Sequence, residues 1–120
     1  MILVDTSVWV DHLRRDNRAL STLLKEGRVL CHPFVIGELA CGNLTARDTI
    51  LEHLSHLPEA PVASHGEVLS FIKSRKLWGT GVGWVDVHLM ASAILAGAAL
   101  WTKDKTLAAQ AQRLGVGAVA

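Results

Sequence analysis

The sequence predicts an α/β fold, a three-layer α/β/α sandwich in which helices cover both faces of a mostly parallel central sheet. Short apolar runs without alternation, such as residues 2–4 and 98–101, are typical of parallel strands buried on both faces. Segments with apolar residues at helical spacing separate these runs, and strands alternating with helices indicate this class of fold. With 120 residues, the chain has the length of one domain, which we expect to cover residues 1–120.

The first half of the chain contains two predicted strands and four predicted helices. A helix follows the first strand and reaches Arg14, and either Thr6 or Ser7 can cap it. Gly27 stops the second helix, and Pro33 suits the first position of the third. After the first helix, the predicted order is helix 18–26, strand 29–31, helix 33–41 and helix 46–57.

The second half continues the alternation. The piece LPEAPVAS is a connection with a short strand expected at Val62, and Ser64 and Glu67 form a capping-box pattern before a helix that reaches Lys76. The glycine-rich LWGTGVGW leads into VDVHLMASAILAG, which is apolar nearly all round and is therefore predicted to be the central, buried helix. The remaining predicted elements are strand 98–101, helix 105–114 and strand 116–119.

Composition excludes several classes of protein. Half of the residues are apolar and 19% are charged, with 12 Lys and Arg against 11 Asp and Glu, so the chain has neither the composition of a disordered protein nor an overall basic charge for nucleic acid. The longest apolar stretch, residues 87–101, is shorter than the roughly 18 residues that a membrane span needs. No secretion signal is visible, so we expect a soluble cytoplasmic protein with reduced thiols.

Two acidic residues follow strands at opposite ends of the sequence. Asp5 comes directly after the first strand, and Asp104 comes shortly after strand 98–101. In open parallel sheets, side chains at the carboxyl ends of the strands line the ligand crevice. Asp5 and Asp104 therefore share one site if their strands are neighbours. Taken singly, each acid can equally be a cap for the helix that follows it.

Two further acids lie on apolar helix faces. Glu38 follows Phe34 by four residues and is expected on the stripe that faces the core. Asp86 lies in the first turn of the buried helix and shares a face with Leu89 and Met90, although the helix dipole also favours an acid there. A common site is the simpler explanation, because capping and dipole arguments need a separate reason for each acid and none applies to Glu38.

Four carboxylates in one crevice require positive charge. Close pairs repel by a few kcal/mol at an effective dielectric of about 20. Oxygen-only ligands suit Mg²⁺ or Mn²⁺, and a carboxylate cluster that holds such ions is the usual apparatus of phosphodiester hydrolysis. The acids thus predict a metal-dependent phosphohydrolase.

The motifs around these acids resemble a known family. VDTSVWVD, FVIGELACG, GVGWVDVHLMASA and LWTKDKTLAAQAQRLGV have the order and spacing of PIN-domain ribonucleases, and within them of VapC-type toxins of type II toxin–antitoxin systems. The resemblance implies that Asp5, Glu38, Asp86 and Asp104 are the catalytic metal ligands. It also implies that Ser7 and Thr102 orient a ligand or a metal-bound water. Leu107 stands where relatives often have phenylalanine.

The resemblance also implies a function. Relatives of this type are Mg²⁺- or Mn²⁺-dependent endoribonucleases that cleave structured cellular RNA and inhibit translation. They form homodimers, and a cognate VapB-type antitoxin covers the acidic pocket with its C-terminal segment. Basic residues near the pocket are candidates for RNA contacts, which are Arg14, Arg15, Arg75, Lys76, Lys103 and Lys105.

Other interpretations remain possible from the sequence. A dehalogenase-like or receiver-like phosphotransfer domain also has aspartates at strand ends, but the former requires a second Asp where Ser7 stands. A PIN-like module that binds RNA or a partner without turnover would keep the same residues. A zinc site can be drawn from two Cys and two His residues, but we favour buried thiols and surface imidazoles. These residues are Cys31, Cys41, His53 and His56.

The remaining His and Trp residues of note are assigned to packing. His88 is expected to be a hydrogen-bonded core or interface residue that points away from the acids. The four tryptophans are expected in the core or at a dimer contact rather than as stacking platforms for bases. They are Trp9, Trp78, Trp84 and Trp101.

Overall fold

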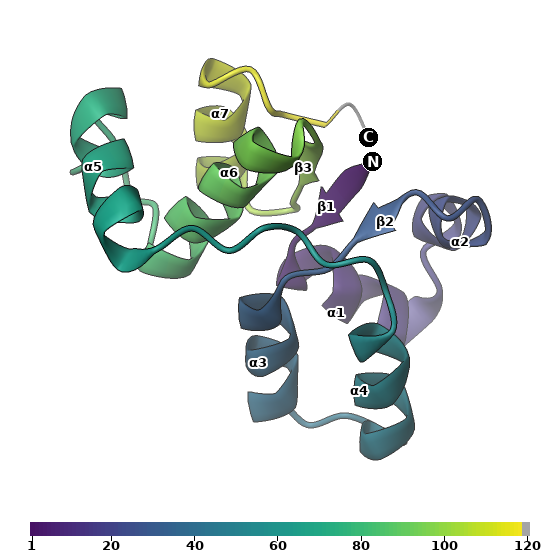
Figure 1. The fold of residues 1–120 in the computed structure, drawn as a ribbon. Helices are drawn as coiled ribbons and strands as arrows, with labels where there is room; N and C mark the ends of the chain where they lie inside the picture. Colours follow the sequence, from purple (N-terminus) through teal and green to yellow (C-terminus); the bar gives the residue numbers. More distant parts are fainter. Residues whose placement is uncertain (119–120) are drawn as a thin grey trace.

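The central sheet is built around the first strand of the chain (Figure 1). The structure is a computed structural model that describes residues 1–118. Within this range, both neighbours of the first strand run parallel to it, with Leu3 opposite Leu30 on one side and opposite Leu100 on the other. The predicted parallel sheet is confirmed. In the order β2–β1–β3, its strands are β1 (Ile2–Val4), β2 (Val29–Leu30) and β3 (Ala99–Trp101).

Helices cover both faces of this sheet. Helix α6 packs against β1 and β3, while α1 and α2 lie on the other side (Figure 1). This arrangement follows from the strand order. The connection from β1 to β2 and the connection from β2 to β3 run across the sheet in opposite directions, and because both crossovers are right-handed, their helices lie on opposite faces of the sheet. In the described part of the chain the helices are α1 (Thr6–Arg15), α2 (Arg18–Lys25), α3 (Pro33–Cys41), α4 (Arg47–Ser55), α5 (His65–Arg75), α6 (Trp84–Ala96) and α7 (Lys105–Arg113).

Local signals begin and end several helices where the sequence predicted. Pro33 is the first residue of α3, as predicted. The Ser64 hydroxyl accepts a hydrogen bond from the Glu67 amide at 3.1 Å, and the Glu67 carboxylate accepts one from the Ser64 amide at 2.8 Å, which is the predicted capping box. Gly97 ends α6 in the left-handed conformation, with φ of 61°.

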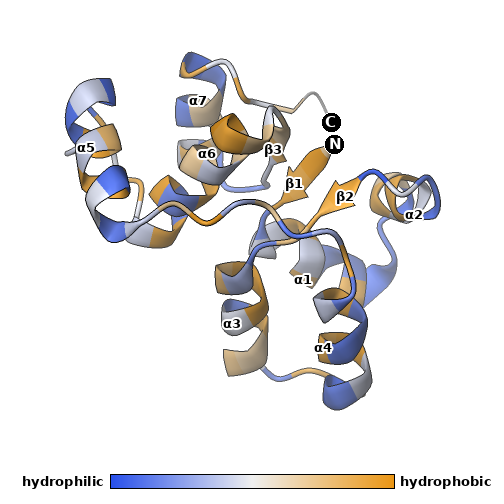
Figure 2. Cartoon of the chain, viewed as in Figure 1, coloured by the Kyte–Doolittle hydropathy of each residue, from blue (hydrophilic) through white to orange (hydrophobic). Residues whose placement is uncertain are grey.

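The core is formed by the strands and α6. Figure 2 shows β1 and β2 as hydrophobic along their length, and Leu3 and Val4 have no exposed surface. In α6, every side chain from Val87 to Ala93 is buried. The prediction of a central, buried helix is confirmed, and this helix is the element that carries Asp86.

Two predicted strands are absent or incomplete. Val62 lies in no strand and is 46% exposed; the only pairing in its connection is a single bridge between Glu59 and Cys31. The predicted last strand is reduced to one parallel bridge between Gly117 and Leu100, and Val119 lies outside the described residues. The short connection after Pro58 has too few backbone partners on β2 to form a ladder.

A membrane-spanning helix is not found. In residues 1–118 none of the helices combines the length and the apolar character that a membrane span requires.

Candidate active site

The sheet brings Asp5 close to the loop that carries Asp104. Strands β1 and β3 pair in parallel with Val4 opposite Trp101, and the Asp5 amide donates a hydrogen bond to the Trp101 carbonyl at 2.9 Å. The expectation that these two strands are neighbours is therefore confirmed. Both acids leave the same edge of the sheet, at the carboxyl ends of their strands.

Asp5 is held by hydroxyl groups from two elements. Its side chain is only 7% exposed, and Oδ2 accepts hydrogen bonds from Ser7 Oγ and Thr102 Oγ1, both at 2.7 Å. The same oxygen accepts a longer bond from the Ser7 amide at 3.4 Å, which caps α1. The capping and site interpretations of Asp5 are therefore compatible, because the hydrogen bonds that its side chain accepts within residues 1–118 all go to Oδ2, one of its two carboxylate oxygens.

Ser7 and Thr102 also hold the loop that leads to Asp104. Ser7 Oγ accepts a hydrogen bond from the Lys103 amide at 2.9 Å, and Thr102 Oγ1 accepts one from the Asp104 amide at 3.0 Å. Asp104 is exposed, and its Oδ1 caps α7 by accepting from the Leu107 amide at 3.0 Å. Asp104 is therefore a helix cap, which was one of the two explanations that the sequence allowed. Its other carboxylate oxygen, Oδ2, takes no part in this cap.

Asp86 faces the charges of the other two aspartates. Its Oδ2 accepts a hydrogen bond from the Gly83 amide at 2.9 Å, which fixes the carboxylate in the first turn of α6. Burial raises the pKa of Asp86, the negative charges of Asp5 and Asp104 raise it further, and the Gly83 hydrogen bond opposes both. Asp86 therefore lies near enough to both Asp5 and Asp104 to be repelled by their charges.

Glu38 is connected to this group through Thr6. The prediction that Glu38 lies on the core-facing stripe is wrong, because its side chain is exposed while its neighbour Leu39 is buried. Glu38 lies instead at the edge of α3 that meets α1, where its Oε1 accepts a hydrogen bond from Thr6 Oγ1 at 2.6 Å. The prediction that Thr6 or Ser7 caps α1 is also wrong, since Asp5 caps this helix.

The four acids have the donor chemistry of a divalent-cation site. Within residues 1–118, none of them forms an ion pair with a Lys, Arg or His side chain. In the same range, no three His, Cys, Asp or Glu side chains are grouped closely enough to hold a metal ion directly. Carboxylate oxygens that repel one another without a cation from the protein fit Mg²⁺ or Mn²⁺, which keep several water ligands.

The predicted basic residues are divided among different environments. Lys103 and Arg15 both bind Asp11, with Nζ–Oδ1 and Nε–Oδ1 distances of 3.2 and 3.0 Å. Arg14 lines a cavity of about 650 Å³ between α1, α3 and α4, which Thr6 and Glu38 also line. The exposed Lys105 directly follows Asp104. These four basic residues lie on α1 or next to the Asp104 loop, and so on elements that form the site.

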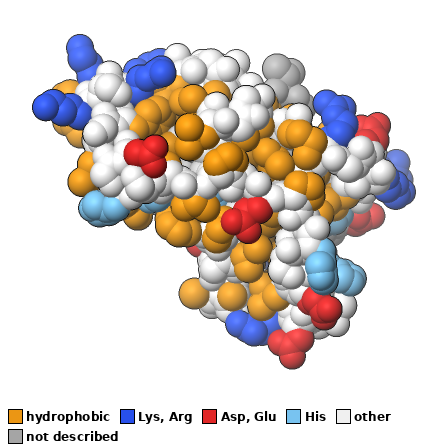
Figure 3. Space-filling view, viewed as in Figure 1, with side chains coloured by type: hydrophobic (Ala, Val, Ile, Leu, Met, Phe, Trp, Pro, Cys, Tyr) orange, Lys and Arg blue, Asp and Glu red, His pale blue; other side chains and the backbone are white. Residues whose placement is uncertain are grey.

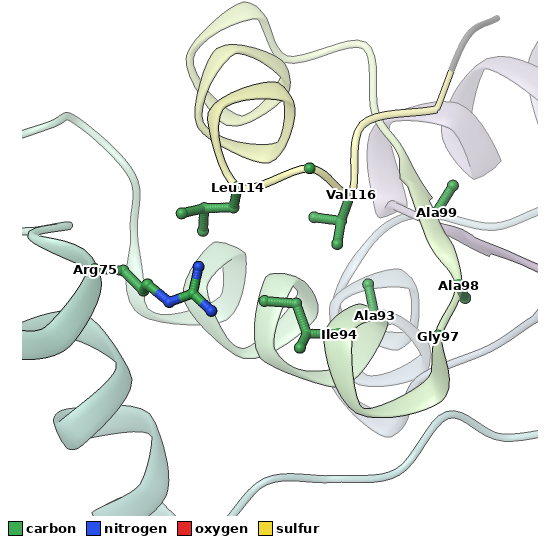
Figure 4. A pocket seen from close by; sticks show the side chains of 9 residues that line it. Arg75, Ala93, Ile94, Gly97, Ala98, Ala99, Leu114 and Val116 are labelled. Atoms are coloured by element: carbon green, nitrogen blue, oxygen red, sulfur yellow. The ribbon is translucent and has the colours of Figure 1, made fainter.

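Arg75 and Lys76 lie far from the acids. Figure 4 shows Arg75 beside a cavity that Ile94 and Gly97 also line, at the end of α6 opposite to Asp86. The eleven residues from Asp86 to Gly97 correspond to roughly 16 Å along a helix. The structure therefore does not bring Arg75 or its neighbour Lys76 together with the other predicted site residues.

The cysteines differ from the prediction in one case. Burial raises the pKa of the Cys31 thiol to about 11, whereas Cys41 is exposed, so the prediction that both thiols are buried is wrong for Cys41. His53 and His56 are exposed, as predicted for surface imidazoles.

The predictions for His88 and for the four tryptophans have different outcomes. His88 is buried, as predicted for a core or interface residue, but its Nδ1 has no hydrogen-bond partner among the described residues, so the predicted hydrogen bond is not found within the chain. Trp9 and Trp101 are buried, whereas Trp78 and Trp84 are 64% and 39% exposed. Trp9 and Trp101 therefore belong to the core, and a dimer contact stays a prediction for Trp78 and Trp84.

Sequence reasoning missed two residues of this region, Thr6 and Asp11. Thr6 was explained as a cap, and Asp11 was not among the predicted site residues. One signal was available for Asp11, because it follows Ser7 by four residues and so lies on the same face of α1. For Thr6 no such signal exists, because its partner Glu38 is 32 residues away in the chain.

Comparisons with known proteins define the family. A family model described as PIN domain matches residues 2–113, and the chain therefore belongs to the PIN-domain family. It is 49% identical over 117 residues to Ribonuclease VapC32 of Mycobacterium tuberculosis, both in strain ATCC 25618 / H37Rv and in strain CDC 1551 / Oshkosh. The match covers 97% of this chain and 94% of each relative. The expectation of a VapC-type PIN-domain ribonuclease is thereby confirmed.

Proposed function

We propose that this chain is the toxin of a VapBC-type toxin–antitoxin system and cleaves structured cellular RNA as a Mg²⁺- or Mn²⁺-dependent endoribonuclease, so inhibiting translation. One observation supports this most directly: burial and, after it, the charges of Asp5 and Asp104 raise the pKa of Asp86, while no protein cation pairs with any of the three among residues 1–118. A site of this kind favours a bound cation, and the relative with 49% identity is named a ribonuclease.

In this proposal, Asp5, Glu38, Asp86 and Asp104 hold the cation. A bound divalent cation supplies the positive charge and Lewis acidity that phosphodiester hydrolysis needs. The chain itself supplies orientation. Ser7 and Thr102 fix the buried carboxylate of Asp5, the Gly83 amide fixes Asp86, and the Thr6 hydroxyl fixes Glu38. These hydrogen bonds restrict the orientations of the carboxylates, and ligands that are not grouped closely enough among residues 1–118 to hold the cation directly would hold it partly through water.

The substrate would approach along the basic side of α1 and the Asp104 loop. The cavity of about 650 Å³ that Arg14, Thr6 and Glu38 line is large enough for part of a nucleotide. Lys105 is exposed next to Asp104 and can meet a phosphate. We therefore propose RNA contacts for Arg14 and Lys105, with Arg15 and Lys103 beside them. Arg75 and Lys76 are too far away to contact the scissile phosphate.

A VapB-type antitoxin and a second copy of the chain are the proposed partners, acting in the cytoplasm. The acidic site suits a basic antitoxin segment, because its carboxylates lack positive partners from the described protein. For the homodimer, hydrophobic side chains gather over the middle of the face in Figure 3. Large exposed hydrophobic residues include Leu69 of α5 and both Trp84 and Leu95 of α6.

The test is an RNA cleavage assay with the native chain, Asp5→Asn and Asp86→Asn. We expect cleavage of structured RNA with Mg²⁺ or Mn²⁺, loss of cleavage in EDTA with recovery on adding metal, and a decrease of at least about a hundredfold in each variant. Asp48→Asn is the matched control, because this acid is exposed at the start of α4 and its removal should leave the rate unchanged. Equal cleavage by all four proteins would exclude the proposal. Metal-independent RNA binding without cleavage would instead indicate a module without turnover.

A further inference from the structure

The loop of Thr102, Lys103 and Asp104 is attached to α1 at two successive levels. At the first level, the Lys103 amide donates a hydrogen bond to Ser7 Oγ at 2.9 Å. At the second, one helical turn further along α1, Lys103 Nζ lies 3.2 Å from Asp11 Oδ1. Ser7 and Asp11 are four residues apart and so lie on one face of the helix. Lys103 therefore contacts α1 through both its backbone and its side chain.

Asp11 is a sheltered acceptor with several donors. Its side chain is 14% exposed, and besides Lys103 it accepts hydrogen bonds from Arg15 Nε at 3.0 Å and Asn17 Nδ2 at 3.1 Å. The hydrogen bond from Lys103, followed by that from Asn17, holds the pKa of Asp11 below its usual value. Asp11 thus remains charged and fixed in position, with its donors arranged around it.

Other ion pairs of the described chain differ from this one. Arg28 and Glu26 are 3.4 Å apart with about half of each side chain exposed, and Arg47 and Asp48 are 3.8 Å apart with Asp48 fully exposed. Such exposed pairs contribute little stability. Lys103, in contrast, joins a sheltered acid on α1 to the loop that ends in Asp104.

We propose that Asp11 is a positioning residue that holds Lys103 and thereby keeps the 102–104 loop seated on α1, with the Asp104 carboxylate directed to the metal site. Its effect on the metal rests on the proposed function, whereas its effect on the loop does not. Lys103 then serves first as an internal anchor of the site rather than as a free contact for RNA phosphate.

The test measures Mn²⁺ binding in the absence of RNA, by electron paramagnetic resonance or calorimetry at constant ionic strength. The proteins are the native chain, Asp11→Asn, Lys103→Met and the double variant. We expect each single variant to bind Mn²⁺ about tenfold more weakly, the lower end of the loss that is typical for residues that orient metal ligands. The Mn²⁺ affinity of the double variant should be no lower than that of whichever single variant binds Mn²⁺ more weakly. The reason is that both substitutions break the same contact, the one between Lys103 and Asp11.

The sign of the Lys103 effect separates positioning from simple electrostatics. If only electrostatics acted, removing a positive charge near a cation site would strengthen cation binding, because Coulomb repulsion of the cation is lost. Removing a negative charge would weaken cation binding, because attraction is lost. Opposite signs for Lys103→Met and Asp11→Asn, or additive losses, would overturn the proposal. Asp16→Asn is the matched control, because Asp16 also lies at α1 but is 80% exposed and does not contact Lys103. Asn tolerates the φ of 54° that Asp16 adopts. The Mn²⁺ affinity of Asp16→Asn should stay within about twofold of the native chain.

A second readout needs no metal. Amide hydrogen exchange of Lys103 and Asp104, followed by NMR in metal-free protein, reports the hydrogen bonds of the loop to Ser7 and Thr102. We expect faster exchange at both amides in Asp11→Asn and Lys103→Met, but not in Asp16→Asn. Unchanged amide exchange in Asp11→Asn and Lys103→Met would refute the proposal that Asp11 holds the 102–104 loop through Lys103, even if Mn²⁺ binds. If the native chain binds no Mn²⁺, the metal-dependent function fails while the exchange data still decide the role of Asp11.

Discussion

At the scale of single residues, hydroxyl groups orient the acids of this site. Ser7 and Thr102 donate to one oxygen of Asp5, and Thr6 donates to Glu38. The Thr6–Glu38 distance of 2.6 Å is that of a short hydrogen bond from a hydroxyl to a carboxylate. Thr6 and Ser7, which follow the first strand, therefore act on two different acids: Ser7 on Asp5, close to it in sequence, and Thr6 on Glu38 in α3.

Removing the Thr6 hydroxyl should weaken the site while keeping the fold. Thr6→Val has nearly the same shape but cannot donate to Glu38, so we expect Mn²⁺ affinity and RNA cleavage to fall about tenfold. Thr6→Ser keeps the hydroxyl and should retain most of the activity. Thr22→Val is the control, because the Thr22 hydroxyl only donates to the Arg18 carbonyl within α2. If Thr6→Val behaves as the native chain does, the hydrogen bond to Glu38 has no role in the site.

At the scale of elements, a buried histidine joins α3 to α6. His32 has no exposed surface; its Nδ1 accepts the hydrogen bond of the Phe34 amide at 3.0 Å and so caps α3. The neutral ring therefore carries its proton on Nε2, which lies 3.1 Å from Ser92 Oγ on α6. Burial lowers the pKa of His32 from 6.5 to about 4, with a smaller contribution from His88. The helices that carry Glu38 and Asp86 are thus linked by a neutral imidazole.

This linkage predicts a pH dependence of stability. Because the His32 pKa is lower in the folded state, the unfolded chain binds more protons between about pH 6.5 and pH 4, so the free energy of unfolding decreases as pH falls through this window. The loss amounts to on the order of 3 kcal/mol at most. Above pH 6.5 the contribution of His32 is fully present.

Urea unfolding at a series of pH values measures this effect. The difference in stability between pH 7 and pH 4.5 should be smaller in His32→Asn, whose side chain can still cap α3 but does not titrate. His53→Asn, at an exposed position of α4, should keep the native pH dependence. The same pH dependence in the native chain and in His32→Asn would show that protonation of His32 is not responsible. Burial also lowers the pKa of His88, which contributes with the same sign in all these proteins.

At the scale of the whole molecule, the fold assembles a site whose charges oppose its stability. Asp86 lies at the start of the most buried helix, where burial and the charges of Asp5 and Asp104 raise its pKa. At neutral pH the folded chain therefore bears the cost of keeping Asp86 ionised. Functional sites commonly reduce stability in this manner.

The metal-free Asp86→Asn variant should be more stable than the native chain. The amide keeps an acceptor for the Gly83 N–H but carries no charge, so the repulsion with Asp5 and Asp104 is lost, and the midpoint of thermal unfolding should rise by a few degrees. Saturating Mn²⁺ should then raise the midpoint of the native chain more than that of Asp86→Asn. Calorimetry with and without metal checks both effects. A lower midpoint in the metal-free variant would contradict a repulsive site.

The sequence by itself determined the fold class, the family and most element positions. Pro33, Gly97 and the pair Ser64 and Glu67 act within a few residues of themselves, so their effects can be predicted without knowledge of the fold. The motifs around the four acids were sufficient to identify a PIN-domain ribonuclease of VapC type, which the comparisons confirm. The metal-ligand roles of Asp5, Glu38, Asp86 and Asp104 stay a prediction.

Only the tertiary structure decided which side chains meet. The pairing of β1 with β3 brings Thr102 to Asp5, 97 residues earlier, and the packing of α1 on α3 brings Thr6 to Glu38. The tertiary structure also placed Glu38 at an exposed edge of α3, because the neighbouring helices, and not the apolar residues of α3 itself, determine which face of this helix is buried. Contacts between distant residues depend on the relative positions of whole elements, which periodicity and capping patterns along the chain do not encode.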